Sequence, residues 1–163
     1  MHSSVFVSIV LSLGLAACAT ARLEQSASQN SSDPSRFAYT RLYCAPDSET
    51  RFESIVLDLA KIPAAPPAPP IYIIKGGLQA ASVNFSAYEP RWGAEDLAKG
   101  LYHPAPAPLF AVVLDGVMSI KTSNGETRRF REGDVIRVED VAPCKGHISV
   151  NENERILRIM VAR

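Results

Sequence analysis

The chain has 163 residues, a length that suits one domain preceded by a short leader. Lys and Arg together number 17, Asp and Glu also number 17, and no run of basic residues occurs. Because binding to nucleic-acid phosphates needs a basic patch, this balance argues against a nucleic-acid partner. Hydrophobic residues make up 47% of the sequence, which is enough to fill the core of a globular domain.

The first twenty residues have the pattern of an export signal. Residues 5–17 form an apolar run that is too short for a membrane span and ends in small residues. Leu15-Ala16-Ala17-Cys18 is similar to a bacterial lipobox, in which the cysteine becomes the lipidated N-terminus. No Lys or Arg precedes Cys18, so an ordinary secretory signal cut near Ala19 or Ala21 is the alternative. The first route predicts a periplasmic or cell-envelope lipoprotein held to the membrane by its lipid, and the second predicts a secreted protein.

Residues 21–36 are polar and rich in Ser, without apolar periodicity, which predicts a flexible spacer. Asn-x-Ser sequons make Asn30 and Asn84 glycosylation candidates in a host that glycosylates. Export leads to an oxidising compartment, where Cys44 and Cys144 are left as an even pair and as candidates for a disulfide. Two separate thiols are the alternative, because the sequence gives no distance between them.

Short strand-like runs recur from residue 37 onward, and the helical signal is confined to about one turn at residues 95–99. Asn124-Gly125 is the clearest turn, since Asn-Gly supplies the positive φ angles of a type I′ hairpin. The proline-dense segment 62–70 predicts an extended connector, because proline cannot donate to a sheet ladder. Many short strands at this spacing predict an all-β sandwich or barrel. The expected strands are residues 37–43, 52–59, 71–74, 81–88, 110–114, 117–122, 127–131, 134–139, 146–150 and 156–161.

Two segments in the second half of the chain resemble the signature motifs of the cupin superfamily. The first cupin motif has the pattern G-x5-H-x-H-x3-4-E-x6-G. Counting back from Gly116 places His103 at its first histidine, Ala105 at its second and Leu109 at its glutamate. The resemblance therefore keeps one of the three metal ligands that this motif usually supplies.

The second cupin motif has the pattern G-x5-P-x-G-x2-H-x3-N. Here Gly133 begins it, Pro143 and Gly146 precede His147, and Asn151 follows at the H-x3-N spacing. The gap between Gly133 and Pro143 is longer than the pattern allows. The metal-ligating histidine of this motif is kept at His147.

Further segments resemble a group of small single-domain cupins, whose members typically contain W-H-P-A-P, S-D-G-E-V-R-R-F and K-G-H in this order. The corresponding segments here are YHPAP, SNGETRRF and KGH, and the similarity covers about residues 38–162. The resemblance implies a double-stranded β-helix, or jelly-roll barrel, of the RmlC-like cupin type over residues 37–163. It also implies a homodimer, because cupins often pair edge strands.

The candidate site residues follow from the motifs, from the period-two alternation of strands and from the aromatic residues near the site, since aromatic side chains with a few polar groups are typical of a small-ligand pocket. His103 and His147 are the candidate catalytic residues, since two imidazoles in a pocket can act as acid and base near neutral pH. A stable divalent metal site normally needs three or more protein ligands, so no cofactor is expected, and a metal at these two histidines is the alternative. The candidate ligand-binding residues are Tyr88, Trp92, Tyr102, Ser149 and Asn151.

The leading expectation for function is an exported cupin barrel that binds a small organic ligand. The alternative is an isomerase, epimerase or lyase in which His103 and His147 form the acid–base pair. Asp140 or Glu139 would then orient one of the imidazoles. This alternative resembles the metal-free sugar-nucleotide epimerases of the same superfamily. The sequence does not select the ligand.

Overall fold

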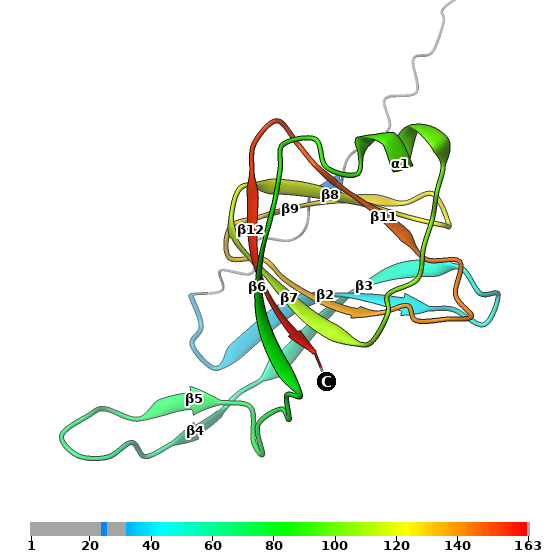
Figure 1. Ribbon diagram of the computed structural model, residues 1–163. Helices are drawn as coiled ribbons and strands as arrows, with labels where there is room; N and C mark the ends of the chain where they lie inside the picture. Colours follow the sequence, from blue (N-terminus) through cyan, green and yellow to red (C-terminus); the bar gives the residue numbers. More distant parts are fainter. Residues whose placement is uncertain (1–23, 26–31, 163) are drawn as a thin grey trace, which may run out of the picture.

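The computed structural model describes residues 24–25 and 32–162, and this part of the chain is mostly β (Figure 1). Twelve strands and one short helix occur in it. They are β1 (Glu24–Gln25), β2 (Arg36–Cys44), β3 (Thr50–Asp58), β4 (Ala60–Ile62), β5 (Ile71–Ile73), β6 (Ser82–Tyr88), α1 (Ala94–Lys99), β7 (Leu109–Asp115), β8 (Val117–Thr122), β9 (Thr127–Arg131), β10 (Val135–Glu139), β11 (His147–Asn151) and β12 (Ile156–Ala162). All ten expected strands are present, so the all-β fold class is confirmed.

Two sheets carry the fold. One has the strand order β1-β9-β8-β11, and the other has the order β3-β2-β10-β7-β12-β6. The pairs β2–β10 and β1–β9 are parallel, whereas the other strand pairs of these two sheets are antiparallel. In the described part of the chain the ladders form separate sheets rather than one closed barrel.

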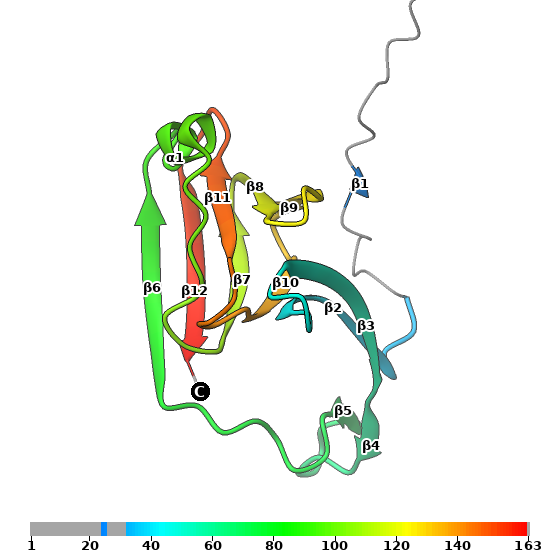
Figure 2. The ribbon, with the colours of Figure 1, turned by 90° about the vertical axis from the view of Figure 1, so that its right-hand side faces the viewer.

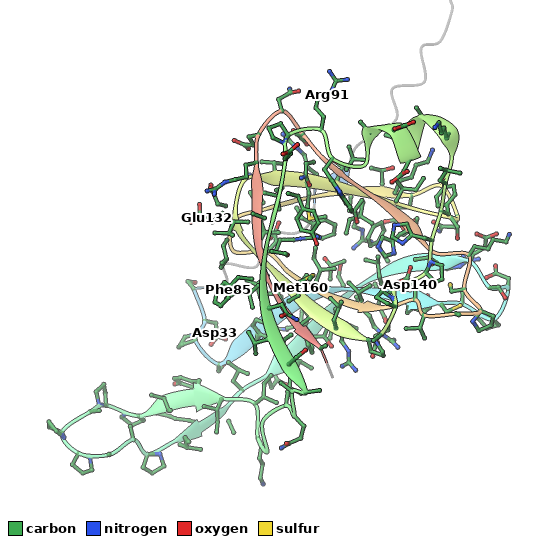
Figure 3. The ribbon with its side chains drawn as sticks, in the orientation of Figure 1. Asp33, Phe85, Arg91, Glu132, Asp140 and Met160 are labelled. Carbon is green, nitrogen blue, oxygen red and sulfur yellow. The ribbon has the colours of Figure 1, made fainter. Side chains whose placement is uncertain are left out.

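The hydrophobic core lies between the two sheets, and side chains from both fill it (Figure 3). The period of two along each strand sends alternate residues inward, as in β8, where Met118, Ile120 and Thr122 are buried. Phe130 of β9 is fully buried and faces Phe52 of β3, with ring centroids 6.1 Å apart. This contact ties the smaller sheet to an edge strand of the larger one.

The hairpin at Asn124-Gly125 is confirmed, but the expected type I′ turn is wrong. Gly125 has a φ of 94°, whereas Asn124 is not among the described residues with positive φ. The Asn124 side chain accepts hydrogen bonds from the Thr122 hydroxyl, at 2.6 Å, and from the Glu126 N–H, at 3.2 Å. These bonds hold Asn124 in an ordinary conformation and leave Gly125 alone to supply the positive φ.

The proline-dense segment does not run as an extended connector. β4 and β5 pair antiparallel, with Ala60 opposite Ile73, so residues 63–70 turn back as the tip of a hairpin. A hydrogen bond from the Ala68 N–H to the Ala65 carbonyl, at 3.0 Å, closes the tip. Figure 2 shows this hairpin at the far end of β3, away from the two main sheets. The expectation failed because the prolines occupy the loop, where no ladder bond is required.

The predicted export signal at residues 1–20, the lipidation candidate Cys18 and the sequon at Asn30 lie outside the described residues. Within the predicted spacer, Glu24–Gln25 forms β1, which pairs with Arg128 and Arg129 of β9. Asn84 is exposed on the edge strand β6. In the part of the chain that the structure describes, no helix has the length and apolar character needed to cross a membrane.

Candidate functional site

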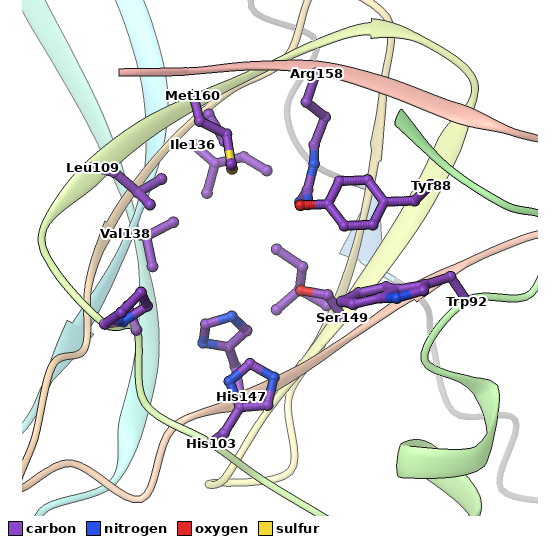
Figure 4. Close-up of a pocket in the computed structure, with 14 residues that line it drawn as sticks. Tyr88, Trp92, His103, Leu109, Ile136, Val138, His147, Ser149, Arg158 and Met160 are labelled. Atoms are coloured by element: carbon purple, nitrogen blue, oxygen red, sulfur yellow. The ribbon is translucent and has the colours of Figure 1, made fainter. Parts of the chain in front are cut away.

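A cavity of about 230 Å³ opens between the two sheets, at the end where β11 meets the chain segment that follows α1 (Figure 4). Most of its wall is apolar, and the polar groups in it come from a few strands and one loop. The lining residues are Tyr88, Trp92, His103, Ala105, Pro106, Leu109, Ala111, Ile120, Ile136, Val138, His147, Ser149, Arg158 and Met160. Among the described residues that line the cavity there is no Asp or Glu.

β11 supplies the polar wall because its inward positions are His147, Ser149 and Asn151. All three are buried, at positions where a strand of purely structural role would place Val or Ile. His147 and Ser149 line the cavity. The Asn151 amide instead donates a hydrogen bond of 2.9 Å to the carbonyl of Glu89. Asn151 thus positions the loop over the cavity rather than facing the cavity itself.

His147 is held by a buried carboxylate. Its Nδ1 lies 2.7 Å from Oδ2 of Asp140, and the Asp140 side chain is fully buried at the end of β10. The same oxygen accepts a hydrogen bond of 3.0 Å from the Thr50 hydroxyl. Glu139, the other residue suggested to orient an imidazole, is paired with Arg41 and Arg137. The Asp140 contact fixes the imidazole ring, so that Nε2 is the nitrogen left for other partners.

The hydrogen-bonded chain behind His147 continues to the two cysteines. Thr50 Oγ1 lies 3.1 Å from Sγ of Cys144, and this thiol is directed at the carbonyl of Ser48 at 3.3 Å. Burial raises the pKa of the Cys44 thiol to about 11, and hydrogen bonding to the Cys144 thiol contributes to the rise. Cys44 and Cys144 are not bonded to each other in this structure, and their thiols lie close enough to interact.

His103 reaches the cavity from the segment that follows α1. Its backbone N–H donates a hydrogen bond of 3.1 Å to the carbonyl of His147, and the N–H of His147 donates one of 3.0 Å to the carbonyl of His103. The two rings lie 5.2 Å apart between centroids, although His103 is exposed and His147 is buried. Gly146 permits this approach, because a Cβ on it would lie 2.0 Å from the backbone of His103 and its φ is 93°.

Trp92 closes one side of the cavity. Its ring lies 4.7 Å from that of Tyr88, between centroids, and its carbonyl accepts a hydrogen bond of 2.9 Å from the N–H of Asn151. Gly93 packs so tightly on β11 that a Cβ there would lie 2.0 Å from the Ser149 carbonyl oxygen. Both contacts dock the segment that carries Trp92 onto β11.

Arg158 is a cavity residue that the sequence motifs did not reveal. It lies on β12, its side chain is 9% exposed, and Nη1 lies 3.6 Å from Sδ of Met118. The guanidinium carbon lies 4.3 Å from the centre of the Tyr88 ring. Burial alone would raise the pKa of Tyr88, but polar contacts with Ser86 and Arg158 and the charge of Arg158 lower it below its usual value. The signal in the sequence was one Arg at a buried position of an otherwise apolar strand.

The structure therefore brings together most of the residues singled out from the sequence. His103, His147, Tyr88, Trp92 and Ser149 line the cavity, whereas Tyr102 and Asn151 do not. In the residues that the structure describes, no three His, Cys, Asp or Glu side chains gather as a metal site. The residues that could hold a metal in the cavity are His103 and His147.

Comparison with protein-family models finds none that matches this chain, and comparison with curated proteins finds no match either. The cavity is therefore the feature of this chain that bears on its function.

Proposed function

We propose that this chain is a small-ligand-binding protein of the cupin type and that the cavity between its sheets is the binding site. The observation that carries the proposal is the cavity wall, in which an apolar surface is interrupted by a few converging polar groups: His103, His147, Ser149 and Arg158. This combination is typical of small-molecule sites. The cavity volume of about 230 Å³ is below the roughly 300–1,000 Å³ of sites for drug-sized ligands, so the expected ligand is compact.

Three observations support the cupin assignment within this proposal. The motif residues His103 and His147 come from segments far apart in the chain and meet at the mouth of the cavity. The motif residue Gly146 is needed for their close approach. Two facing, mainly antiparallel sheets are compatible with a jelly roll. Export of the domain, as a lipoprotein or as a secreted protein, and its homodimerisation are further parts of the proposal.

A second candidate function is metal-free acid–base catalysis, and the Asp140–His147 contact favours it. A carboxylate on Nδ1 holds the imidazole in one orientation and supports proton transfer at Nε2. His103 would be the second acid–base group, 5.2 Å away between ring centroids. An isomerase, epimerase or lyase would use the pair as base and acid.

The first test is the content of the cavity. Metal analysis and native mass spectrometry of the purified chain are expected to find no stoichiometric transition metal and to find a small co-purifying molecule. Stoichiometric metal would refute the metal-free form of both candidate functions. A chain that carries neither a metal nor any molecule would be screened against small organic compounds by ligand-detected NMR, and failure of all of them to bind would count against the binding proposal.

Substitution of the two histidines distinguishes binding from catalysis. For a binding protein, His103→Ala and His147→Ala should each weaken affinity for the identified molecule by about 1–3 kcal/mol, as for one lost buried hydrogen bond. For an enzyme, each should abolish turnover while circular dichroism shows an intact fold. Tyr102→Phe is the matched control, because Tyr102 is adjacent in sequence but does not line the cavity. Unchanged affinity and turnover in both histidine variants would mean that the functional site lies elsewhere.

A further inference from the structure

The cavity contains a buried positive charge that its wall does not neutralise. Arg158 is 9% exposed and lines the cavity. Its guanidinium contacts Sδ of Met118 and the ring of Tyr88, and its Nε has no hydrogen-bond partner. Across residues 24–25 and 32–162, no carboxylate forms an ion pair with it.

A buried arginine without a carboxylate is an unusual arrangement. The guanidinium stays protonated at any physiological pH, so it cannot escape desolvation by losing its proton. Buried charges in proteins are normally paired, because removing a charge from water is costly. The Tyr88 ring at 4.3 Å offers a cation–π contact, which compensates part of that cost. The Tyr88 hydroxyl gives Arg158 a polar contact as well, but Nε is left without a hydrogen-bond partner and no carboxylate balances the charge.

Among the described residues, the cavity wall supplies no negatively charged acceptor for Arg158. No Asp or Glu is among the lining residues. The Asp140 carboxylate is fully buried behind His147, and its Oδ2 is shared between His147 and Thr50. In Figure 4 Arg158 enters the cavity from the side opposite the two histidines, and all three residues line the same cavity. A bound molecule could therefore meet the guanidinium directly.

We propose that the ligand of this cavity is a small organic acid, whose carboxylate binds to the guanidinium of Arg158. The planar guanidinium can donate two parallel hydrogen bonds to one carboxylate. The apolar body of the acid would lie against Leu109, Ile136 and Val138, which form the part of the wall across the cavity from Tyr88 and Trp92 (Figure 4). This inference rests on the proposed binding function and adds the chemical class of the ligand. A free phosphate fits less well, because it has no apolar body to lie against Leu109, Ile136 and Val138.

The test compares carboxylic acids with their uncharged amides. Acetate and benzoate are titrated into the full chain, alongside acetamide and benzamide, and the resonances of cavity residues are followed by two-dimensional NMR. Each acid is expected to bind at least about 10-fold more tightly than its amide, and the difference is expected to reach about 100-fold for a well-formed charge-assisted pair. Inorganic phosphate is expected to bind more weakly than benzoate.

Substitutions of Arg158 test whether this residue causes the preference for acids over amides. Arg158→Met keeps a long apolar side chain and is expected to bind benzoate and benzamide equally, whereas Arg158→Lys should retain part of the preference. Arg155→Met is the matched control: Arg155 stands three residues earlier, is exposed and pairs with Asp115, so the variant loses the same charge away from the cavity. It is expected to bind like the unchanged chain.

The outcomes separate this inference from the proposed function. Equal binding of acids and amides to the unchanged chain, or a preference for acids that survives in Arg158→Met, overturns the organic-acid proposal and leaves a binding cavity in place. Binding of phosphate as tight as that of benzoate also overturns it. Failure of all four organic probes to shift any cavity resonance overturns both proposals. If Arg158→Met does not fold, Arg158→Lys and Arg155→Met still decide whether the preference depends on the guanidinium.

Discussion

Two regions lie side by side between the same two sheets, and they differ in what fills them. The first, here called the sealed core, is formed by buried apolar side chains that do not line the cavity: Leu42, Phe52, Val113, Met118, Phe130 and Ile156. The second is the cavity. β12 contributes to both, since Ile156 is fully buried in the sealed core and Arg158, two residues later on the same face, lines the cavity.

The difference shows how one strand pattern can produce both a stable interior and a binding site. In the sealed core the inward positions carry large apolar residues that fill the space between the sheets. At the cavity the inward positions include smaller residues such as Ala105 and Ala111, and polar residues such as Ser149, which leave space and offer hydrogen bonds. Met118 marks the boundary, because its sulfur contacts the guanidinium of Arg158.

Removal of a large side chain from the sealed core should have the largest effect on the free energy of unfolding. Phe130 is fully buried and packs on Phe52, so Phe130→Ala should reduce the free energy of unfolding by about 3–5 kcal/mol. Chemical denaturation followed by circular dichroism measures this loss. Phe85→Ala is the control, because Phe85 is 70% exposed on β6, and its effect should stay within about 0.5 kcal/mol. Equal losses in the two variants would contradict the distinction between sealed core and surface.

Oxidation of the two cysteines should give the next largest effect. A bond between Cys44 and Cys144 would close a loop of about 100 residues and should stabilise the fold by roughly 2–4 kcal/mol. The expected result is the loss of both free thiols in chain isolated from an oxidising compartment, with a midpoint of unfolding that falls on reduction. Cys44→Ser is the control and should make the midpoint insensitive to reductant. Two titratable thiols in the unreduced chain would contradict the disulfide.

Replacing the Asp140 carboxylate behind His147 should reduce the free energy of unfolding by less than Phe130→Ala does. Asp140→Asn can place an N–H donor where Oδ2 now faces His147 and Thr50, and we expect a loss of about 1–3 kcal/mol in the free energy of unfolding. Nitrogen NMR of the imidazole should show a changed tautomer for His147. Asp115→Asn is the control, because its ion pair with Arg155 is exposed and should contribute only about 0–1 kcal/mol. An unchanged His147 tautomer would contradict the orienting role of Asp140.

The sequence predicted the fold class and the two histidines better than it predicted the shape of the site. Strand alternation and turn residues are local signals, and they located all ten expected strands. The motif resemblance predicted that His103 and His147 belong to one site. Arg158 was missed because a single charged residue in an apolar strand carries no motif, and its burial depends on how β12 sits between β6 and β7. Tyr102, expected in the pocket as one of the aromatic residues near the site, does not line the cavity, because neighbouring residues point to opposite sides of an extended segment.

The smallest expected effect concerns Asp134, which is 4% exposed in the turn between β9 and β10. Burial raises the pKa of its carboxyl, although the hydrogen bond from the Arg131 N–H and the Arg131 charge act against the rise. Because the folded-state pKa is above the unfolded value of about 3.9, the folded state binds more protons between the two values. Stability should therefore fall as the pH rises through this window, and the penalty should persist at pH 7.

Asp134→Asn tests this sign, because an amide oxygen can still accept the hydrogen bond of 2.9 Å from the Arg131 N–H without carrying a charge. We expect the variant to be more stable than the unchanged chain at pH 7, by on the order of 1 kcal/mol or less, and the gain to disappear near pH 3. Urea denaturation at both pH values measures it. Asp47→Asn should behave in the opposite way, because hydrogen bonds from the Glu49 N–H and from Arg51 lower the pKa of that exposed carboxyl. A lower free energy of unfolding for Asp134→Asn at pH 7 would contradict this sign. It would mean that the turn compensates the buried charge of Asp134 and, unlike the region around Arg158, tolerates an ionised group without a ligand.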